Sequence, residues 1–375
     1  MSTVVRTYRE ALQALSPPAG RIRNPVRFNK TAPLLYANSS AIEEKLEWTE
    51  GIIAPYLATL KIPHKLSFNK NEPVIIPDLH GDFEHLMVTL YRHGLIHKDF
   101  NLDPKHEYIF LGDFYDRGDN SDIIDLWLNK QLEKEITCYR LVGNHEVGFF
   151  VTNDGIPHQT PNNDFYNDLD RGLTLTRDLL KTIAEGKIQA AYLFYDKKTN
   201  APILVVHSFI IQEDFDKLQI NMENIEEFVR TLNERLIKIA SDAYSSSGFE
   251  TLSNLTKYNY RKVTEIFSSD HFFTLRRDSD TGEYSSYLKR RAKEVRRDVF
   301  STNIAAKLPR VYQIVGHTPL KYFENESPKT SNYPHISGTP EGYVQFSDVG
   351  IGYYFLEPLE GRPQVVIKPQ LARTF

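Results

Sequence analysis

The chain has 375 residues, of which 41% are hydrophobic and 25% are charged, a composition typical of a globular protein with a large core. Its 45 lysines and arginines nearly balance 49 aspartates and glutamates, and a net charge of -4 does not predict nucleic acid as a partner. Cys138 is the single cysteine, which excludes a disulfide within the chain and is consistent with a reducing compartment.

The N-terminal sequence lacks the apolar stretch of about 7–15 residues that a classical secretory signal contains. No later stretch reaches the ~20 consecutive apolar residues that a transmembrane helix needs. We therefore expect no transmembrane segment. The expected location is the cytoplasm, or a host cell into which the protein is exported without a classical signal peptide.

Residues 1–70 are predicted to form an N-terminal arm followed by a helix, ahead of a main domain over residues 71–375. Prolines and a glycine disfavour helix in the arm, at Pro17, Pro18, Gly20, Pro25 and Pro33. Residues 40–60 place apolar side chains at helical spacing after Ser39 and Ser40, which are typical helix-capping residues.

Strand-like and helix-like patterns alternate over residues 74–144. The strands are predicted at 74–77, 108–113 and 137–144, and the helices at 84–96 and 121–132. Such alternation indicates βαβ units with right-handed crossovers. Later strands are expected at 201–208, 310–317, 342–350 and 364–368. The predicted fold class is α/β, a layered β-sandwich flanked by helices.

A helical insertion is predicted within the main domain at about 210–305. Helical patterns cover residues 224–244 and 287–308, whereas the polar link at 245–263 is loop-like at its start. We expect the two helices to form a hairpin or a cap over the edge of the sheet. The insertion is also a candidate docking surface for a partner.

Five short motifs complete apolar, strand-like runs, and each carries Asp, His or Asn. They are PDLHGD at 77–82, GDFYDRGD at 112–119, GNHE at 143–146, VVHS at 205–208 and VGHT at 315–318. Strands deliver such side chains to the edge of a sheet, where α/β proteins bind their ligands. The motifs therefore predict one site, and their oxygen and nitrogen donors suggest that it holds two metal ions.

The individual ligands follow from residue chemistry. Asp78 and His80 lie two residues apart at a predicted strand end and can turn toward one ion. Carboxylate and imidazole together suit manganese, iron or zinc better than calcium. A bridging carboxylate at Asp113 can hold a second ion ~3.5–4 Å from the first. The second ion would also be held by Asn144, His207 and His317.

Two charged side chains in these motifs are candidates for catalysis. His145 beside a carboxylate such as Asp116 gains stabilised positive charge and can protonate a leaving alkoxide. The guanidinium of Arg117 can form paired hydrogen bonds with phosphate oxygens.

At these residues the sequence resembles the metallophosphoesterases, and specifically their phosphoprotein phosphatase branch. The motifs GDxHG, GDxxDRG, GNHE, a lone His and GH of that branch have counterparts in this order over residues 73–350, with Pro77 replacing the first Gly. The resemblance implies two divalent ions, manganese first with iron or zinc as alternatives. It places Asp78, His80 and Asp113 on one ion and Asp113, Asn144, His207 and His317 on the other. It also implies that Asp116 and His145 form the acid pair and that Arg117 binds phosphate.

Further segments indicate a bacterial-type branch. FFTLRRD at 272–278 resembles that branch's pattern, which makes Arg277 the candidate second phosphate-binding arginine and Arg276 its rival. FSDVG at 346–350 points the same way and places Asp348 close to the ligands. The long helical insertion is similar to that of Wip-type bacterial effector phosphatases.

The function expected from these features is a metal-dependent phosphoprotein phosphatase. It would hydrolyse phosphomonoesters on Ser/Thr and/or Tyr of a phosphorylated protein, in one step, by a hydroxide that two metals activate. Arg117, Asn144 and Arg277 would bind the phosphate. A small-molecule or dinucleoside polyphosphate phosphoesterase would carry the same metal motifs. A third interpretation is an inactive scaffold that binds phosphopeptides.

Overall fold

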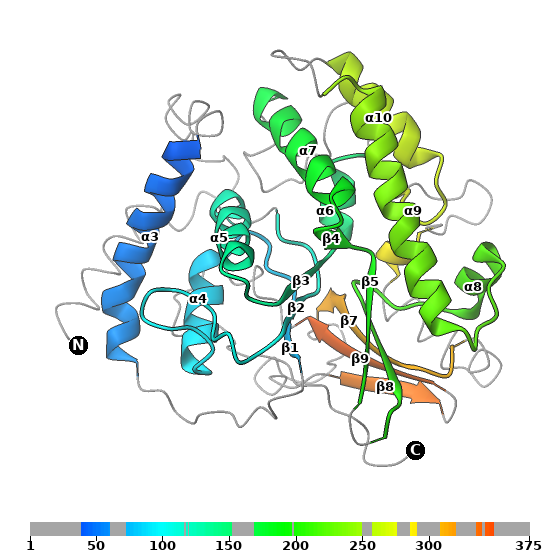
Figure 1. The fold of residues 1–375 in the computed structure, drawn as a ribbon, viewed down its shortest axis with the longest axis horizontal. Coiled ribbons are helices and arrows are strands. Elements are labelled where there is room, and N and C mark those ends of the chain that lie inside the picture. The colour runs from blue at the N-terminus through cyan, green and yellow to red at the C-terminus, as the bar shows by residue number, and fades with distance from the viewer. Residues whose placement is uncertain are drawn as a thin grey trace, which may run out of the picture.

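The computed structural model describes residues 39–60, 73–115, 118, 120–151, 169–196, 199–249, 257–275, 286–290, 308–319, 335–339 and 342–348. They form a mixed α/β fold with two sheets, which confirms the predicted fold class. Figure 1 shows helices α3, α4 and α5 on one side of strands β1 to β3, with α7, α9 and α10 in a second group on the other side.

The first sheet is parallel and has the order β1-β2-β3-β4. Its strands are Val74–Ile76, Tyr108–Phe110, Cys138–Leu141 and Ile188–Gln189. Helices α4 (Phe83–Arg92) and α5 (Ser121–Glu133) connect the first three strands, as the βαβ pattern predicts. Because the strands run parallel, the residues that follow β1, β2 and β3 emerge at the same edge.

The second sheet has the order β5-β6-β7-β9-β8. In chain order, its strands are β5 (Ala191–Tyr195), β6 (Pro202–Val206), β7 (Tyr312–Pro319), β8 (His335–Thr339) and β9 (Gly342–Asp348). β6, β7 and β9 pair in parallel, while β5 and β8 are antiparallel edge strands. The strand predicted at 364–368 lies outside the described residues.

Helix α4 shows how the local sequence sets the ends of an element. The Asp82 side chain caps its start by accepting the His85 N–H at 3.1 Å. Gly94 adopts φ +68°, and the Leu95 N–H donates to the Leu90 carbonyl at 2.9 Å. This glycine-terminated hydrogen bonding ends a helix, so the predicted extension of α4 to residue 96 is wrong.

The described residues of the segment 210–305 include the helices α8 (Gln212–Leu218), α9 (Ile225–Ser246) and α10 (Lys257–Ser268). Most of the second predicted helix, over residues 291–307, lies outside the described residues. α10 packs on α9 and begins within the predicted link 245–263, after the start that was expected to be loop-like. Residues 287–289 form only the short 3₁₀ helix η2, and Arg290 is extended, so no α-helix begins at residue 287.

The N-terminal helix α3 (Ser39–Thr59) shares the core of the main domain. It packs on α4 and α5, and Lys45 Nζ pairs with Asp122 Oδ1 at 2.8 Å. The domain boundary at residue 70 stays a prediction.

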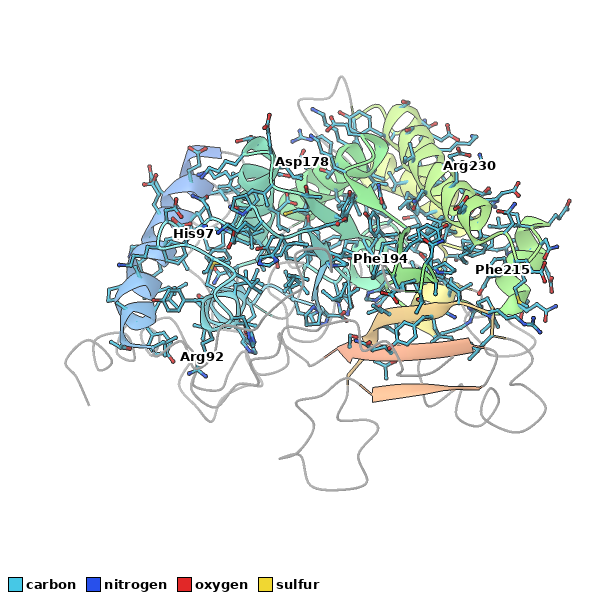
Figure 2. The ribbon with its side chains drawn as sticks, turned by 60° about the horizontal axis from the view of Figure 1, so that its bottom comes forward. Arg92, His97, Asp178, Phe194, Phe215 and Arg230 are labelled. Atoms are coloured by element: carbon cyan, nitrogen blue, oxygen red, sulfur yellow. The ribbon has the colours of Figure 1, made fainter. Side chains whose placement is uncertain are left out.

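Buried apolar side chains join the sheets to the surrounding helices. Leu179 and Leu180 of α7 (Leu169–Ala184) are buried, whereas charged side chains such as Asp178 on α7 and Arg230 on α9 face solvent (Figure 2). Among the described helices, none combines the length and the apolar character needed to cross a bilayer.

Candidate metal centre

Three of the predicted ligands have an unusual backbone conformation. His80, Asp113 and His317 have φ values of 48°, 51° and 60°, in the left-handed region that non-glycine residues seldom adopt. The His80 and Leu79 N–H groups both donate to the Asp113 carbonyl, at 2.7 and 3.1 Å. The turns after β1 and β2 are therefore bonded to each other, and residues strained in this way are frequent at functional sites.

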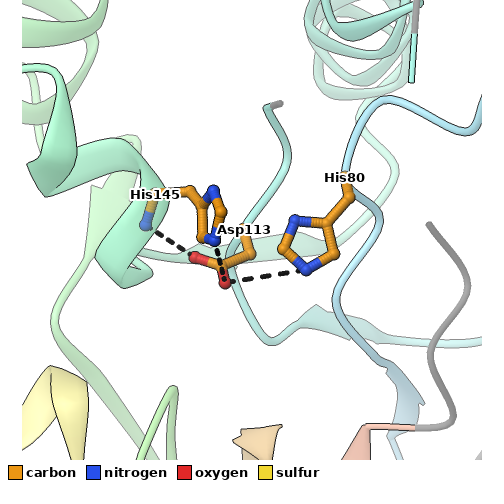
Figure 3. Close-up of side chains that lie close together, drawn as sticks. All are labelled: His80, Asp113 and His145. Atoms are coloured by element: carbon orange, nitrogen blue, oxygen red, sulfur yellow. Dashed lines mark hydrogen bonds and ion pairs between the residues drawn. The ribbon is translucent and has the colours of Figure 1, made fainter. Parts of the chain in front are cut away.

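The first group of potential ligands comprises His80, Asp113 and His145 (Figure 3). Their ligand atoms lie within 4.8 Å of one another. Asp113 Oδ2 is 3.8 Å from His80 Nε2 and 3.7 Å from His145 Nε2. Asp113 Oδ1 accepts the His145 N–H at 2.8 Å, which ties the start of α6 (Asn144–Gly148) to the carboxylate.

A second group shares Asp113 and adds His207 and His317. His207 Nε2 is 3.5 Å from Asp113 Oδ1 and 3.2 Å from Asn144 Oδ1. The rings of His207 and His317 have centroids 5.1 Å apart. Asp113 thus lies between two groups of donors, the arrangement expected of a carboxylate that bridges two ions.

His207 has its proton on the nitrogen that faces away from this group. Its Nδ1 lies 2.8 Å from the Leu111 carbonyl, which only accepts hydrogen bonds, so Nδ1 must donate. Burial lowers the pKa of His207, which favours the neutral ring, and in that form Nε2 carries a lone pair. Nε2 and the Asn144 amide oxygen are then two acceptors facing each other, an arrangement that a cation stabilises.

Two glycines allow the carboxylates to sit close to the backbone. A Cβ at Gly143 would lie 2.2 Å from Asp113 Oδ1, and a Cβ at Gly316 would lie 2.2 Å from Asp78 Oδ1. Asp78 is not in either group of three; its carboxylate accepts the His317 N–H at 3.0 and 3.3 Å. The absence of a Cβ at Gly316 leaves room for the Asp78 carboxylate, which the His317 N–H holds in place.

The donor set fits divalent transition metals. Carboxylate oxygens, an amide oxygen and imidazole nitrogens meet in a buried space, and the six predicted ligands are Asp78, His80, Asp113, Asn144, His207 and His317, each at most 6% exposed. Buried carboxylates need a positive counter-charge, which such ions supply. His145 is more open, with 13% of its side chain exposed.

Glu146 is a functional residue that the sequence reasoning missed. Its carboxylate accepts the N–H groups of Gly143 at 2.7 Å, Asp113 at 2.8 Å and Phe114 at 2.8 Å. Burial, and then the Asp113 carboxylate, raise its pKa to about 7, while the backbone N–H donors favour its charged form. Glu146 thus joins two ligand-bearing turns. Its place in GNHE, directly after His145, was the available signal.

His317 differs from the expectation that each motif follows its strand. It lies inside β7, where the pairing with β9 changes register between Val315 and Pro319. Such an irregularity redirects a side chain. The described residues do not include Asp116, Arg117, Arg276 or Arg277, whose roles stay predictions. Asp348 is the last residue of β9 and pairs with Pro319 through the backbone.

Several known proteins are similar to parts of this chain. The rat serine/threonine-protein phosphatase with EF-hands 1 is 37% identical over 81 residues, which are 21% of this chain and 12% of that protein. The cold-active protein-tyrosine phosphatase of a psychrophilic Shewanella sp. gives 15% identity and a TM-score of 0.39, over 75% of this chain and 72% of that one. A serine/threonine phosphatase from Saccharomyces cerevisiae has 14% sequence identity and a TM-score of 0.35, over 81% of this chain and 77% of that one. The phosphatase domain of the Legionella effector WipB has 11% identity and a TM-score of 0.30, over 70% of this chain and 88% of that one.

The family of this chain is shown by a match that extends over all five motifs. The model of the calcineurin-like phosphoesterases matches residues 74–319, well over half of the chain and a range that includes both ligand groups. This match supports a hydrolase that acts on phosphate monoesters, and it implies the divalent ions that metallophosphoesterases use. The chain belongs to the calcineurin-like phosphoesterase family.

Proposed function

We propose that this protein is a phosphoprotein phosphatase of the bacterial type that uses two divalent ions, with manganese as the first choice. The observation that carries the proposal is that two groups of buried donors share the Asp113 carboxylate. The proposed ligands are Asp78, His80 and Asp113 for one ion, and Asp113, Asn144, His207 and His317 for the other.

The metals, when bound, supply positive charge for the phosphoryl group and lower the pKa of a water molecule to give a nucleophile. The chain supplies orientation. Glu146 holds the amides of Gly143 and Asp113, and the Leu111 carbonyl fixes the His207 ring. Because these contacts are buried, the donors stay in place without competition from water.

His145 is proposed as the general acid. Its side chain is the most exposed of the histidines around Asp113. Its backbone N–H donates a hydrogen bond to Asp113 Oδ1. From that position it can pass a proton to the oxygen of the leaving alcohol. We also propose that Asp116 is the partner of this acid. The phosphate group would be bound by Arg117, Arg277 and the side-chain amide of Asn144.

The proposed substrate is a phosphorylated protein. The rat relative, a serine/threonine-protein phosphatase, supports this class over the part of the chain that it matches. Partner docking on the helical insertion and export into a host cell stay predictions.

The test is hydrolysis by the full chain after its metals have been removed. With added Mn²⁺, the protein should cleave an aryl phosphate, and a chelator should abolish the reaction. Phosphoserine, phosphothreonine and phosphotyrosine peptides are then compared with dinucleoside polyphosphates at equal concentration. Faster cleavage of the peptides is expected. Faster cleavage of the dinucleotides would identify a small-molecule enzyme, and metal binding without any hydrolysis would identify a scaffold.

A further inference from the structure

The residues that follow His207 are held by a part of the insertion that is far away in the sequence. We call residues 208–211 the post-His207 loop. Arg290, which follows η2, accepts a hydrogen bond from Ser208 Oγ through its carbonyl oxygen. Its guanidinium donates to the Phe209 carbonyl at 3.2 Å. One residue therefore contacts the two positions directly after a proposed metal ligand.

The guanidinium of Arg290 is itself fixed by Asp214 of α8. Nη2 donates to Asp214 Oδ1 at 2.8 Å, and Nη1 donates to Oδ2. Asp214 Oδ2 also accepts the Ile211 N–H at 2.9 Å, so the pair holds the end of the post-His207 loop as well. The Asp214 side chain is 1% exposed and that of Arg290 is 13% exposed. Paired hydrogen bonds of this kind fix orientation as well as charge.

The rest of the loop is bonded to β7. The Gln313 side chain accepts the Ile210 N–H at 2.8 Å and donates to the Ile210 carbonyl at 2.9 Å. The His207 carbonyl accepts the Gly316 N–H at 2.9 Å. Each residue from Ser208 to Ile211 is thus bonded to Arg290, Gln313 or Asp214, and Arg290 contacts the first two of them.

From these contacts we infer that Arg290, paired with Asp214, is a positioning residue for His207 and hence for one of the two metal ions. Because its side chain is only 13% exposed and is paired with Asp214, Arg290 is not a freely solvated surface charge. The inference rests on the proposed function, because it assigns Arg290 a task at the proposed second ion. Residues that orient metal ligands from behind contribute about 10–100-fold to metal affinity or activity.

The test measures Mn²⁺ binding directly, by titrating metal-free full-length protein and following the electron paramagnetic resonance signal of free Mn²⁺. The variant Arg290→Met with Asp214→Asn removes both charges together and leaves no buried charge without a partner. One of the two ions should bind ~10–100-fold more weakly, and the other should bind as in the wild type. Arg290→Lys keeps the charge but loses the paired geometry, and should give a smaller loss at the same ion.

A second ion pair of the insertion provides the matched control. Arg235 of α9 pairs with Asp270, which accepts the N–H groups of Phe272 and Phe273, much as Asp214 accepts that of Ile211. Among the described residues, neither Arg235 nor Asp270 bonds to the post-His207 loop. Arg235→Met with Asp270→Asn should therefore weaken folding without changing the affinity for either ion.

The outcomes separate the inference from the proposed function. A wild-type chain that binds no Mn²⁺ would overturn the proposed two-metal function itself. A wild-type chain that binds two ions, beside Arg290 variants of unchanged affinity, would overturn only the positioning role. Equal losses in the Arg290 and Arg235 double variants would also overturn it, because the effect would then be general loosening of the insertion. If thermal unfolding shows that the Arg290 double variant does not fold, the Mn²⁺ affinity of Arg290→Lys decides whether Arg290 positions His207.

Discussion

Asp113 is the residue on which the two ligand groups meet, so it carries the sharpest prediction at the scale of single residues. Asp113→Asn removes the charge shared by both ions and should abolish metal binding and hydrolysis together. Metal content and rate are measured on the same sample. Asp122→Asn is the matched control, since it breaks the pair with Lys45 between α3 and α5 and should leave metal content unchanged.

His145 should behave differently if it is the acid. His145→Asn should retain both ions but slow turnover by ~10²–10⁴, the usual loss when general acid catalysis is removed. His145 Nε2 lies 3.7 Å from Asp113, so the alternative is a role as a ligand in the first group. Loss of one ion from this variant would support the alternative, and wild-type turnover would exclude both roles.

The sequence predicted which motif residues lie close together, because each follows, or lies near the end of, an apolar strand pattern; their role as ligands stays a prediction. Asp113, Asn144 and His207 are brought together as the motifs predict. Glu146 was missed because its role depends on backbone N–H groups contributed by two separate turns, Gly143 and Asp113–Phe114. Only the folded chain brings those donors to one carboxylate.

At the scale of elements, the glycine between β3 and α6 provides a test that does not change any ligand. Gly143→Ala would place a Cβ 2.2 Å from Asp113 Oδ1, so it should displace the carboxylate and sharply weaken metal binding. Gly51→Ala is the same change in α3, where nothing lies within 4 Å. That control should raise stability by ~0.5–1 kcal/mol and leave metal binding alone. Equal metal affinity in the two variants would contradict the account of the β3–α6 turn.

Helix α10 is an element that the sequence pattern did not predict. Tyr260, Val263, Thr264 and Phe267 are buried at helical spacing, yet their surroundings in the sequence are polar and include Asn and Ser. The helix is stabilised by packing: the Phe267 ring lies tilted against Phe150 with centroids 4.4 Å apart, and the Tyr260 hydroxyl donates to the Phe149 carbonyl. Tertiary contacts of this kind override local propensity.

At the scale of the whole molecule, buried thiol and phenol groups predict sensitivity to alkali. Burial raises the pKa of Cys138 to about 12 and raises those of Tyr108, Tyr287 and Tyr312. The unfolded thiol titrates near ~8.5, so its stabilising contribution is complete below that pH and is lost as pH rises toward the folded pKa. The free energy of unfolding should fall with pH above about 8.5, by up to ~1.4 kcal/mol per pH unit for this one group.

Urea unfolding of the wild type and of Cys138→Ala between pH 7 and 10.5 measures that contribution. The variant should lose stability less steeply above pH 8.5, because its side chain does not titrate. Equal slopes in the two proteins would mean that Cys138 is not protected from ionisation in the folded state.

Anomalous X-ray diffraction from crystals grown with Mn²⁺ can show directly whether Asp113 lies between two metal ions. We expect two anomalous peaks ~3.5–4 Å apart, one beside His80 and one beside His207, with the Asp113 carboxylate reaching both. A single peak, or peaks that do not contact Asp113, would contradict it.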